Sequence, residues 1–169
     1  MPRYDVPHAA PEPLRVVQRL VNSIDREHGH EWLNGAGDLA ALLGCDVAPS
    51  DVERARGFRE ALRQLLLANN GQAIDTAAVA TFNAAAGALA LRLDDTGELE
   101  IASEDALGRI AAIAVRAMLD GTWQRLKACR NCSWAFYDHS KNRSAVWCSM
   151  QLCGNRLKTR AYRSRKARR

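Results

Sequence analysis

The chain has 169 residues, of which 47% are hydrophobic and 25% are charged, and its formal net charge is +5. These proportions are near the averages for soluble globular proteins, so they favour an ordered chain with enough apolar surface for a core. No uninterrupted apolar run approaches the roughly 18 residues that a membrane span needs. The first residues lack a basic segment followed by an apolar one, so we expect no secretory signal and a cytoplasmic location.

The charge is divided unevenly along the chain. Residues 1–120 hold 11 basic and 18 acidic residues, a net charge of −7, whereas residues 121–169 hold 13 and 1, a net charge of +12. An acidic body followed by a basic segment favours a polyanionic partner for that segment, most often nucleic acid. The alternative is a disordered tail that only keeps the protein in solution.

The chain begins with a proline-rich stretch. Residues 1–13 contain four prolines and predict an extended arm. Apolar residues at helical spacing predict a helix from Leu14 that stops near Gly29. A second, short helix is expected within residues 32–45, with Asp38 near its start.

Residues 48–71 predict the clearest helix of the chain. Ser50 is expected as its N-cap, with Glu53 completing a capping box. Asn69, Asn70 and Gly71 are expected to end it.

A further helix, rich in alanine and capped by Asp75, is expected next. The spacing of apolar residues then changes from helical to alternating. Leucines alternate along residues 88–103 around Asp-Asp-Thr-Gly, and this pattern predicts a β-hairpin. A last helix is expected to open at Ser103 and to close at Gly121. The body is therefore predicted to be mainly α with one β-hairpin.

Four of the five cysteines lie close together after this body. They are Cys129, Cys132, Cys148 and Cys153. A C-x2-C pair followed after fifteen residues by a C-x4-C pair is the usual framework of a structural zinc site. Four thiolates complete the tetrahedral shell of Zn²⁺, so we expect the metal to stabilise the fold and not to activate water.

Other uses of these cysteines fit less well. A redox C-x-x-C normally opens a helix in a thioredoxin-like βαβ unit, and the pattern contains no such unit. An iron–sulfur cluster also takes four cysteines, but the basic, hairpin-like surroundings favour zinc. His139 is expected at the surface and not as a ligand, and Cys45 as a small apolar residue in the interior.

The segments "SWAFY" and "AVWC" between the two cysteine pairs predict two strands around a polar turn. Trp134, Phe136 and Trp147 are expected to cover the metal site; the alternative is that their rings stack on unpaired bases. A basic helix is expected to follow. The segment is thus predicted to be a small α+β, treble-clef-like zinc module, a β-hairpin plus a C-terminal helix.

The predicted C-terminal helix is the candidate surface for nucleic acid. Its basic residues are Arg156, Lys158, Arg160, Arg163, Arg165 and Lys166. Arg156, Arg160 and Arg163 share one helical face, which suits contact with the phosphates of duplex DNA and with one or two guanine edges. Asn155 is expected either to hydrogen-bond a cysteine sulfur or the local backbone, or to contact DNA.

The motifs "C-x2-C-x-W-x-F-x-D-x-S-K-N-R" and "W-C-S-M-x-x-C-G-N-R" resemble the CGNR zinc finger, whose name-giving residues stand here at 153–156. The layout of residues 14–121, with "RLVNSID" and "FREALRQLL", is similar to the helical ABATE domain. The resemblance implies a bacterial, stress-induced transcription regulator whose finger binds DNA and whose N-terminal domain senses a small-molecule effector. Formation of a homodimer by the helical domain is a further expectation. The family commonly has arginines where this chain has Ala145 and Val146, so the helix after Cys153 is the better candidate for DNA contact.

The expected organisation is an arm (1–13), a helical ABATE-like domain (14–121) and a CGNR-type finger with a basic helix (126–169). Asn22 and Arg59, polar residues beside apolar helical faces, are the candidates for a ligand pocket in the helical domain.

Two other function classes remain open. The first is an RNA-binding or protein-interaction adaptor that uses the same finger. The second is an enzyme built on the cluster "DREHGHE", but His28 and His30 diverge on a helix and Gly29 marks its end. We therefore expect a solvated loop there, and no enzyme.

Overall fold

The computed structural model describes residues 8–156 and residue 159 of the chain. The helices are α1 (Arg15–Val21), α2 (Ala36–Leu43), α3 (Pro49–Asn69), α4 (Thr76–Ala86) and α5 (Ala106–Leu119), with short helical turns η1 (Trp123–Arg125) and η2 (Met150–Gly154). The strands form three antiparallel pairs: β1 (Ile24–Asp25) with β2 (His30–Glu31), β3 (Ala90–Leu93) with β4 (Leu99–Ala102), and β5 (Leu126–Ala128) with β6 (Ala135–Tyr137).

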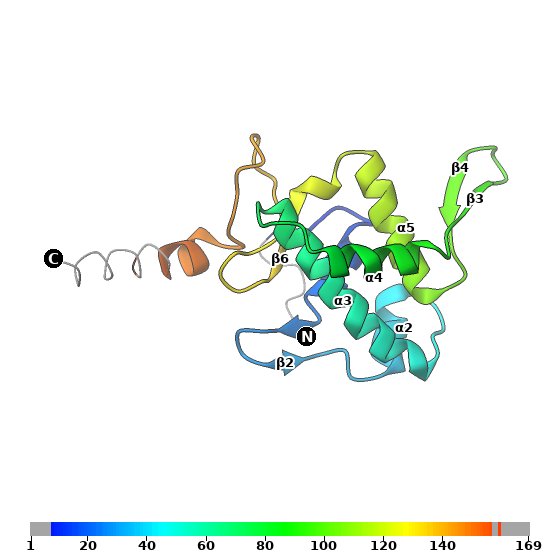
Figure 1. Ribbon diagram of the computed structural model, residues 1–169, viewed down its shortest axis with the longest axis horizontal. Helices are drawn as coiled ribbons and strands as arrows, with labels where there is room; N and C mark the ends of the chain where they lie inside the picture. The colour runs from blue at the N-terminus through cyan, green and yellow to red at the C-terminus, as the bar shows by residue number, and fades with distance from the viewer. Residues whose placement is uncertain (1–7, 157–158, 160–169) are drawn as a thin grey trace.

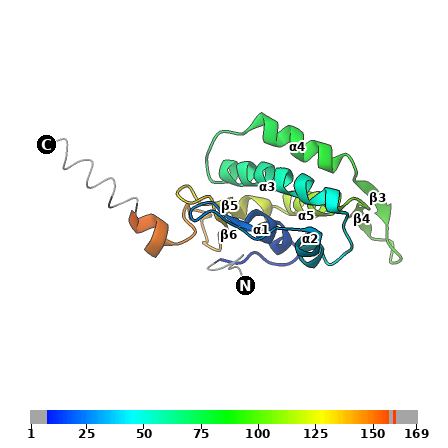
Figure 2. The same ribbon diagram turned by 90° about the horizontal axis from the view of Figure 1, so that it is seen from below.

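The long helix α3 runs through the middle of the molecule, and the other helices pack around it (Figures 1 and 2). The β3–β4 hairpin projects from one end of this body. The β5–β6 hairpin and the four cysteines lie at the opposite end, where β5 packs against α3. This arrangement is the mainly helical body with a small α+β module that the sequence predicts. None of the helices in the described part of the chain is long and apolar enough to cross a lipid bilayer.

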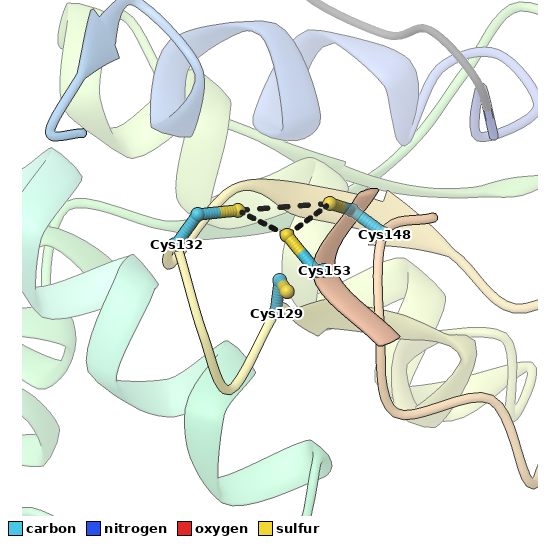
Figure 3. Close-up of side chains that lie close together, drawn as sticks. All are labelled: Cys129, Cys132, Cys148 and Cys153. Carbon is cyan, nitrogen blue, oxygen red and sulfur yellow. Dashed lines mark hydrogen bonds between the residues drawn. The ribbon is translucent and has the colours of Figure 1, made fainter. Parts of the chain in front are cut away.

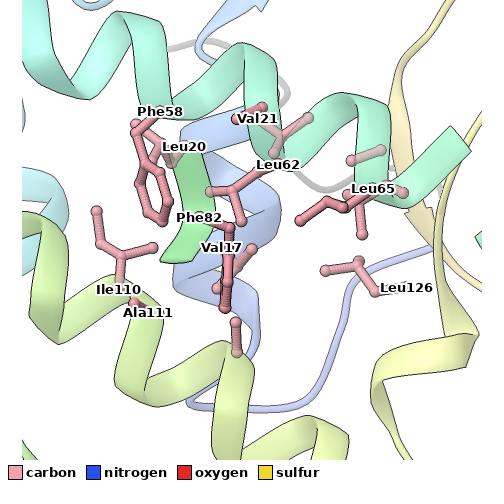
Figure 4. Close-up of a cluster of buried hydrophobic side chains, with 14 of the residues drawn as sticks. Val17, Leu20, Val21, Phe58, Leu62, Leu65, Phe82, Ile110, Ala111 and Leu126 are labelled. Carbon is pink, nitrogen blue, oxygen red and sulfur yellow. The ribbon is translucent and has the colours of Figure 1, made fainter. Parts of the chain in front are cut away.

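One hydrophobic core extends through the body and into the β5–β6 hairpin (Figure 4). Leu20 of α1, Phe58 of α3 and Ile110 of α5 are at most 1% exposed. Leu126 of β5 and Tyr137 of β6 belong to the same cluster of buried side chains. The hairpin that carries the first two cysteines is therefore packed on the helical body and not only tethered to it.

The start of α3 differs from the prediction by two residues. Ala48 is the N-cap and Pro49 the first helical residue, while the Asp51 carboxylate accepts a hydrogen bond of 3.0 Å from the Ala48 N–H. Proline suits this position because its fixed φ is helical and its missing N–H would have no partner there. The capping box predicted at Ser50 and Glu53 was wrong for this reason.

The starts of the next two helices follow the same chemistry. The Asp75 carboxylate caps α4, as predicted, by accepting from the N–H groups of Ala77 and Ala78. Asp105 caps α5 in the same way, so this helix starts after Asp105 and not at Ser103. An aspartate at the N-cap satisfies the N–H groups that the first turn leaves without a backbone partner.

The helix predicted to reach Gly29 ends at Val21. Beyond it, the Asp25 carboxylate accepts from the N–H groups of Glu27 and His28, at 2.9 and 3.2 Å, and forms a turn. Such side-chain bonds to nearby N–H groups compete with helix formation. The result is the short β1–β2 hairpin, so the body contains a second hairpin besides the predicted β3–β4.

The strand pairing predicted for the finger was also wrong. β6 pairs with β5, which precedes the first cysteine, and not with residues 145–148. A buried ion pair makes some of the contacts of the 145–148 segment instead: Lys127 Nζ lies 2.7 Å from Asp138 Oδ2 and 3.1 Å from the Ala145 carbonyl. Asp138 Oδ2 in turn accepts from the Ala145 N–H at 2.9 Å. Side chains thus replace a strand ladder here.

Candidate metal centre and nucleic-acid interface

The four cysteines of the two pairs come together at one point (Figure 3). The sulfurs of Cys132, Cys148 and Cys153 lie 3.6 Å apart in every pairing, and all four sulfurs lie within 4.8 Å of one another. A disulfide needs about 2.05 Å between sulfurs. Four sulfurs on a tetrahedron at about 2.3 Å from Zn²⁺ stand about 3.8 Å apart. The spacing therefore fits a zinc shell made of four cysteine thiolates.

The four thiols are close enough to affect one another's ionisation. Contacts with Cys132 and Cys148 lower the pKa of the Cys129 thiol, while contact with Cys129 raises the pKa values of Cys132 and Cys148. One thiolate thus opposes the formation of the next. A bound dication removes this opposition, because metal binding deprotonates its thiol ligands.

A tight turn aims the first pair of cysteines. The Cys129 carbonyl accepts from the Ser133 N–H at 2.9 Å, and the Cys129 N–H donates to the Trp134 carbonyl at 2.9 Å. Ser133 has a φ of +62°, in the left-handed region. This conformation reverses the chain directly after Cys132, so that both sulfurs lie on one side.

The second pair is positioned by the turn η2. The Ser149 carbonyl accepts from the Cys153 N–H at 3.0 Å. A Cβ atom on Gly154 would lie 2.6 Å from Met150 Sδ and 3.2 Å from a ring carbon of Trp147. Glycine at 154 therefore allows the turn to pack closely on Trp147.

Aromatic rings cover the cluster, as predicted. Phe136 is buried beside the cysteines, and Trp134 and Trp147 are partly buried against them. Trp134 also meets Trp32 of the body edge to face, with 6.4 Å between ring centres. The three rings are thus used in packing.

The amide beside a sulfur belongs to Asn131, whose Nδ2 lies 3.5 Å from Cys153 Sγ. Asn155 is exposed, and its carbonyl accepts from Thr159 Oγ1 at 2.9 Å. The predicted contact of Asn155 with a sulfur is therefore made by Asn131. The sequence signal that could have identified Asn131 is its position between the first two cysteines, in the motif "C-R-N-C".

A buried arginine of α3 joins the finger to the body. Arg63 is 1% exposed and donates to the carbonyls of Ser133, at 2.7 Å, and Val21, at 2.6 Å. Its Nε donates to Glu60 at 3.0 Å. One side chain thus fixes the first cysteine turn to α1 and α3. The role of Arg63 was not predicted from the sequence, although this residue stands four residues after Arg59 within an apolar stretch.

Side-chain amides make the other connections. Asn70 Nδ2 donates to the carbonyls of Ala128, at 2.7 Å, and Val146, at 2.9 Å, so it contacts both halves of the finger. The Asn70 carbonyl accepts from Arg130, in the first cysteine turn. The C-terminal end of α3 is therefore a support for the metal cluster.

The two residues predicted to line a ligand pocket have structural contacts instead. Asn22 is fully buried and pairs with the backbone of Ala135, accepting at 2.7 Å and donating at 2.9 Å. Arg59 is 4% exposed and forms a bidentate pair with Glu31, both bonds being 2.8 Å, while also donating to Ser23. Neither Asn22 nor Arg59 lines either of two surface cavities, of about 370 and 350 Å³.

Only the first of the candidate DNA residues lies in the described part of the chain. Arg156 follows the turn η2 and forms an ion pair with Glu27 of the β1–β2 hairpin. The other five residues lie outside the described residues; they are Lys158, Arg160, Arg163, Arg165 and Lys166. Lys141 and Arg143, in the loop before the second cysteine pair, are exposed.

The acid–histidine cluster forms the exposed end of the β1–β2 hairpin. His28 Nδ1 lies 2.7 Å from Asp25 Oδ2, and this contact raises the pKa of His28. The rings of His28 and His30 are 6.5 Å apart. Within the described residues, the four cysteines are the group of side chains arranged to hold a metal ion.

Two family models match the chain. The ABATE model, described as "Putative stress-induced transcription regulator", matches residues 14–121. The model of the CGNR zinc finger matches residues 125–166 and includes all four clustered cysteines. No curated protein matches the chain.

Proposed function

We propose that this chain, which belongs to the ABATE family, binds duplex DNA through a zinc finger and regulates transcription. The observation that carries the proposal is the four-cysteine cluster, because its last ligand lies on the turn that leads directly to the basic segment. Cys153 is 2% exposed, whereas the Arg156 side chain, three residues later, is 49% exposed. Zn²⁺ bound by the four cysteines would fix this turn, and its chemistry there is structural.

The electrostatics support a polyanionic partner for the finger end. The described basic side chains Lys141, Arg143 and Arg156 are exposed, and the segment from residue 121 onward has a net charge of +12. Phosphate contacts of this kind give affinity, while base-edge contacts give sequence preference. Arg156 has to leave its ion pair with Glu27 before it can bind a phosphate. This ion pair with the body therefore opposes the contact of Arg156 with DNA.

The decisive experiment is selection of bound sequences from a random duplex pool, with zinc-stripped protein as the control. Enrichment of one sequence by the zinc-bound protein alone supports the proposal. If zinc removal leaves the selection unchanged, the finger is not the reader.

The affinity for the selected duplex should depend strongly on salt. Neutralising six to ten phosphates lowers affinity by about 10³- to 10⁵-fold between about 50 and 200 mM salt. Fluorescence anisotropy of the labelled duplex gives this slope. A flat salt response contradicts the mechanism, and tighter binding to structured RNA than to any duplex supports the RNA-binding adaptor.

The N-terminal domain is proposed as the regulatory part, which senses an effector or forms a dimer. The surface cavity of about 370 Å³ between β4 and α5 offers room for a small molecule. Both matching families are regulatory or zinc-binding, which supports a non-enzymatic function only indirectly.

A further inference from the structure

The loop of residues 139–144, between β6 and the second pair of cysteines, lies at the same end of the molecule as the cysteine cluster (Figure 1). We call it the basic loop, because it carries the exposed side chains of Lys141 and Arg143. Beneath it, Lys127 and Asp138 form an ion pair of 2.7 Å, and their side chains are only 6% and 0% exposed. A buried ion pair adds little net stability, because both charges lose their water. The pair is therefore better explained by what it holds in place.

The buried pair fixes the backbone at both ends of the basic loop. Asp138 Oδ1 accepts from the Ser140 N–H at 2.9 Å, and Asp138 Oδ2 accepts from the Ala145 N–H at 2.9 Å. Lys127 Nζ donates to the Arg143 carbonyl at 2.6 Å and to the Ala145 carbonyl at 3.1 Å. The loop thus has a defined conformation although its surface faces water.

The backbone of Arg143 points to a use for its side chain. Its φ is +51°, in the left-handed region that glycine and asparagine adopt more easily than arginine. The side chain is exposed, and in the described part of the chain its guanidinium has no hydrogen-bond or ion-pair partner. Packing therefore does not explain an arginine at this strained position. A contact with a partner molecule does.

Lys141 is free in the same sense, within the residues that the structure describes. The other basic side chains in the described part of the finger are already bound to carbonyls or to a carboxylate; they are Arg125, Lys127, Arg130 and Arg156. From residue 121 onward the sequence has one acidic residue, the buried Asp138. The two free cations of the described finger therefore share one loop, and that loop contains no carboxylate.

We propose that the basic loop is a second phosphate-binding surface of the finger, fixed by Lys127 and Asp138 before DNA binds. Two cations without a neighbouring carboxylate suit the repeated phosphates of a duplex. A loop that is already ordered loses less conformational entropy on binding. This inference rests on the proposed function, and it adds a contact separate from the segment after Cys153.

The test is the salt dependence of binding to the selected duplex, measured by fluorescence anisotropy. For the double variant Lys141→Ala, Arg143→Ala, the slope of log affinity against log salt should be smaller by about two, because each phosphate contact contributes about 0.9. The affinity at about 100 mM salt should fall about tenfold or more.

The matched control is Arg109→Ala with Arg116→Ala. It removes the same charge from exposed side chains of α5, which line the cavity beside β4, and the β3–β4 hairpin lies at the end opposite the cysteines. Its slope should equal that of the wild type.

Single variants of Arg143 separate its charge from its role in the loop. Arg143→Gly removes the cation but suits the left-handed backbone, so the slope should fall by about one while the stability to urea is retained. Arg143→Lys keeps the charge and should keep the slope. If the residue served only the structure of the loop, Arg143→Gly would bind DNA as the wild type does.

Hydrogen exchange of the DNA-free protein tests whether the loop is ordered in advance. The Ala145 N–H, bound to the Asp138 carboxylate, should be protected without DNA. Exchange at the rate of an unfolded peptide would overturn this part of the proposal. A duplex-binding Lys141→Ala, Arg143→Ala protein with the wild-type slope would overturn the phosphate contact alone, whereas a wild type that binds no duplex overturns the proposed function as well.

Discussion

The helical body and the finger differ in what fills their interiors. The body buries leucines, valines, alanines and phenylalanines from all five helices. The separate cluster in the described part of the finger has four buried members, of which Cys129, Cys148 and Cys153 are candidate metal ligands and only Phe136 is a large apolar residue. We therefore expect the body to fold by the hydrophobic effect alone, and the finger to need a metal ion as well as the polar contacts that α1 and α3 supply.

Removing the metal should have the largest effect, and it should act on the finger and not on the body. Cys153→Ser, or a chelator, should unfold the finger while the body stays folded, because structural zinc contributes apparent binding free energies of about 10 kcal/mol or more. Hydrogen exchange should show loss of protection in β6 and retained protection in α3 and α5.

The fifth cysteine provides the control for this experiment. Cys45 lies outside the cluster, so Cys45→Ser should retain one tightly bound zinc ion per chain and wild-type protection in β6. Unchanged protection of β6 in Cys153→Ser would show that the body alone stabilises the finger.

Arg63→Met should have the next largest effect, because it cuts the contacts between the two regions. The change removes a buried guanidinium and leaves the carbonyls of Val21 and Ser133 without this donor. We expect a loss of about 3 kcal/mol in the free energy of unfolding. Urea unfolding measures it. Arg54, on the same helix but with a half-exposed side chain, is the control, and Arg54→Met should cost about 1 kcal/mol or less.

The location of the Arg63 effect is as informative as its size. Exchange protection should fall first in the turn after Cys129 and at the end of α1. A uniform loss over the whole chain would mean that Arg63 serves the core of the body and not its junction with the finger.

The smallest expected effect is a change in how the stability of the body depends on pH. Burial raises the pKa of Glu31, but the hydrogen bonds and charge of Arg59 outweigh it and lower the pKa below its ordinary value. A lowered folded pKa contributes stability that is present above the unfolded pKa of about 4.3 and is lost as pH falls through the folded pKa. Glu31→Gln should therefore flatten the acid limb of stability, by about 1 kcal/mol.

This experiment is best done in the Cys153→Ser protein, where acid release of zinc does not contribute. Urea unfolding between about pH 6 and pH 3 gives the slope. Glu53→Gln is the matched control, because the Glu53 side chain is 82% exposed. If Glu31→Gln and Glu53→Gln give the same slope, the buried pair with Arg59 does not set the acid stability of the body.

The features that sequence predicted well are those with short-range signals. The spacing of the cysteine pairs identified all four members of the cluster, and the change from helical to alternating period located β3 and β4. The helices were predicted, but their observed starts differ from the predicted ones where another polar residue supplies the cap, as Asp51 does for α3.

The features that sequence could not predict depend on partners far along the chain. Asn22 and Arg59 stand beside apolar faces, which also suits residues of a ligand pocket. Their actual partners are Ala135, 113 residues from Asn22, and Glu31, 28 residues from Arg59. The pairing of β5 with β6 was missed because the aromatic and β-branched residues of "AVWC" suggested a strand there, whereas Lys127 and Asp138 contact that segment through side chains.

The amide of Asn22 has a consequence for how this finger can be transplanted. It binds both the N–H and the carbonyl of Ala135, as a neighbouring strand would, and Gln18 donates to the same carbonyl at 3.2 Å. The open edge of β6 is thus covered by the side chains of Gln18 and Asn22, from α1 and its C-cap, together with the carbonyl of His8, which accepts from the Tyr137 N–H at 2.9 Å. Fused to a foreign protein, residues 125–166 would keep their cysteines but lose this edge partner. A functional chimera should therefore need a graft of α1 as well as the finger.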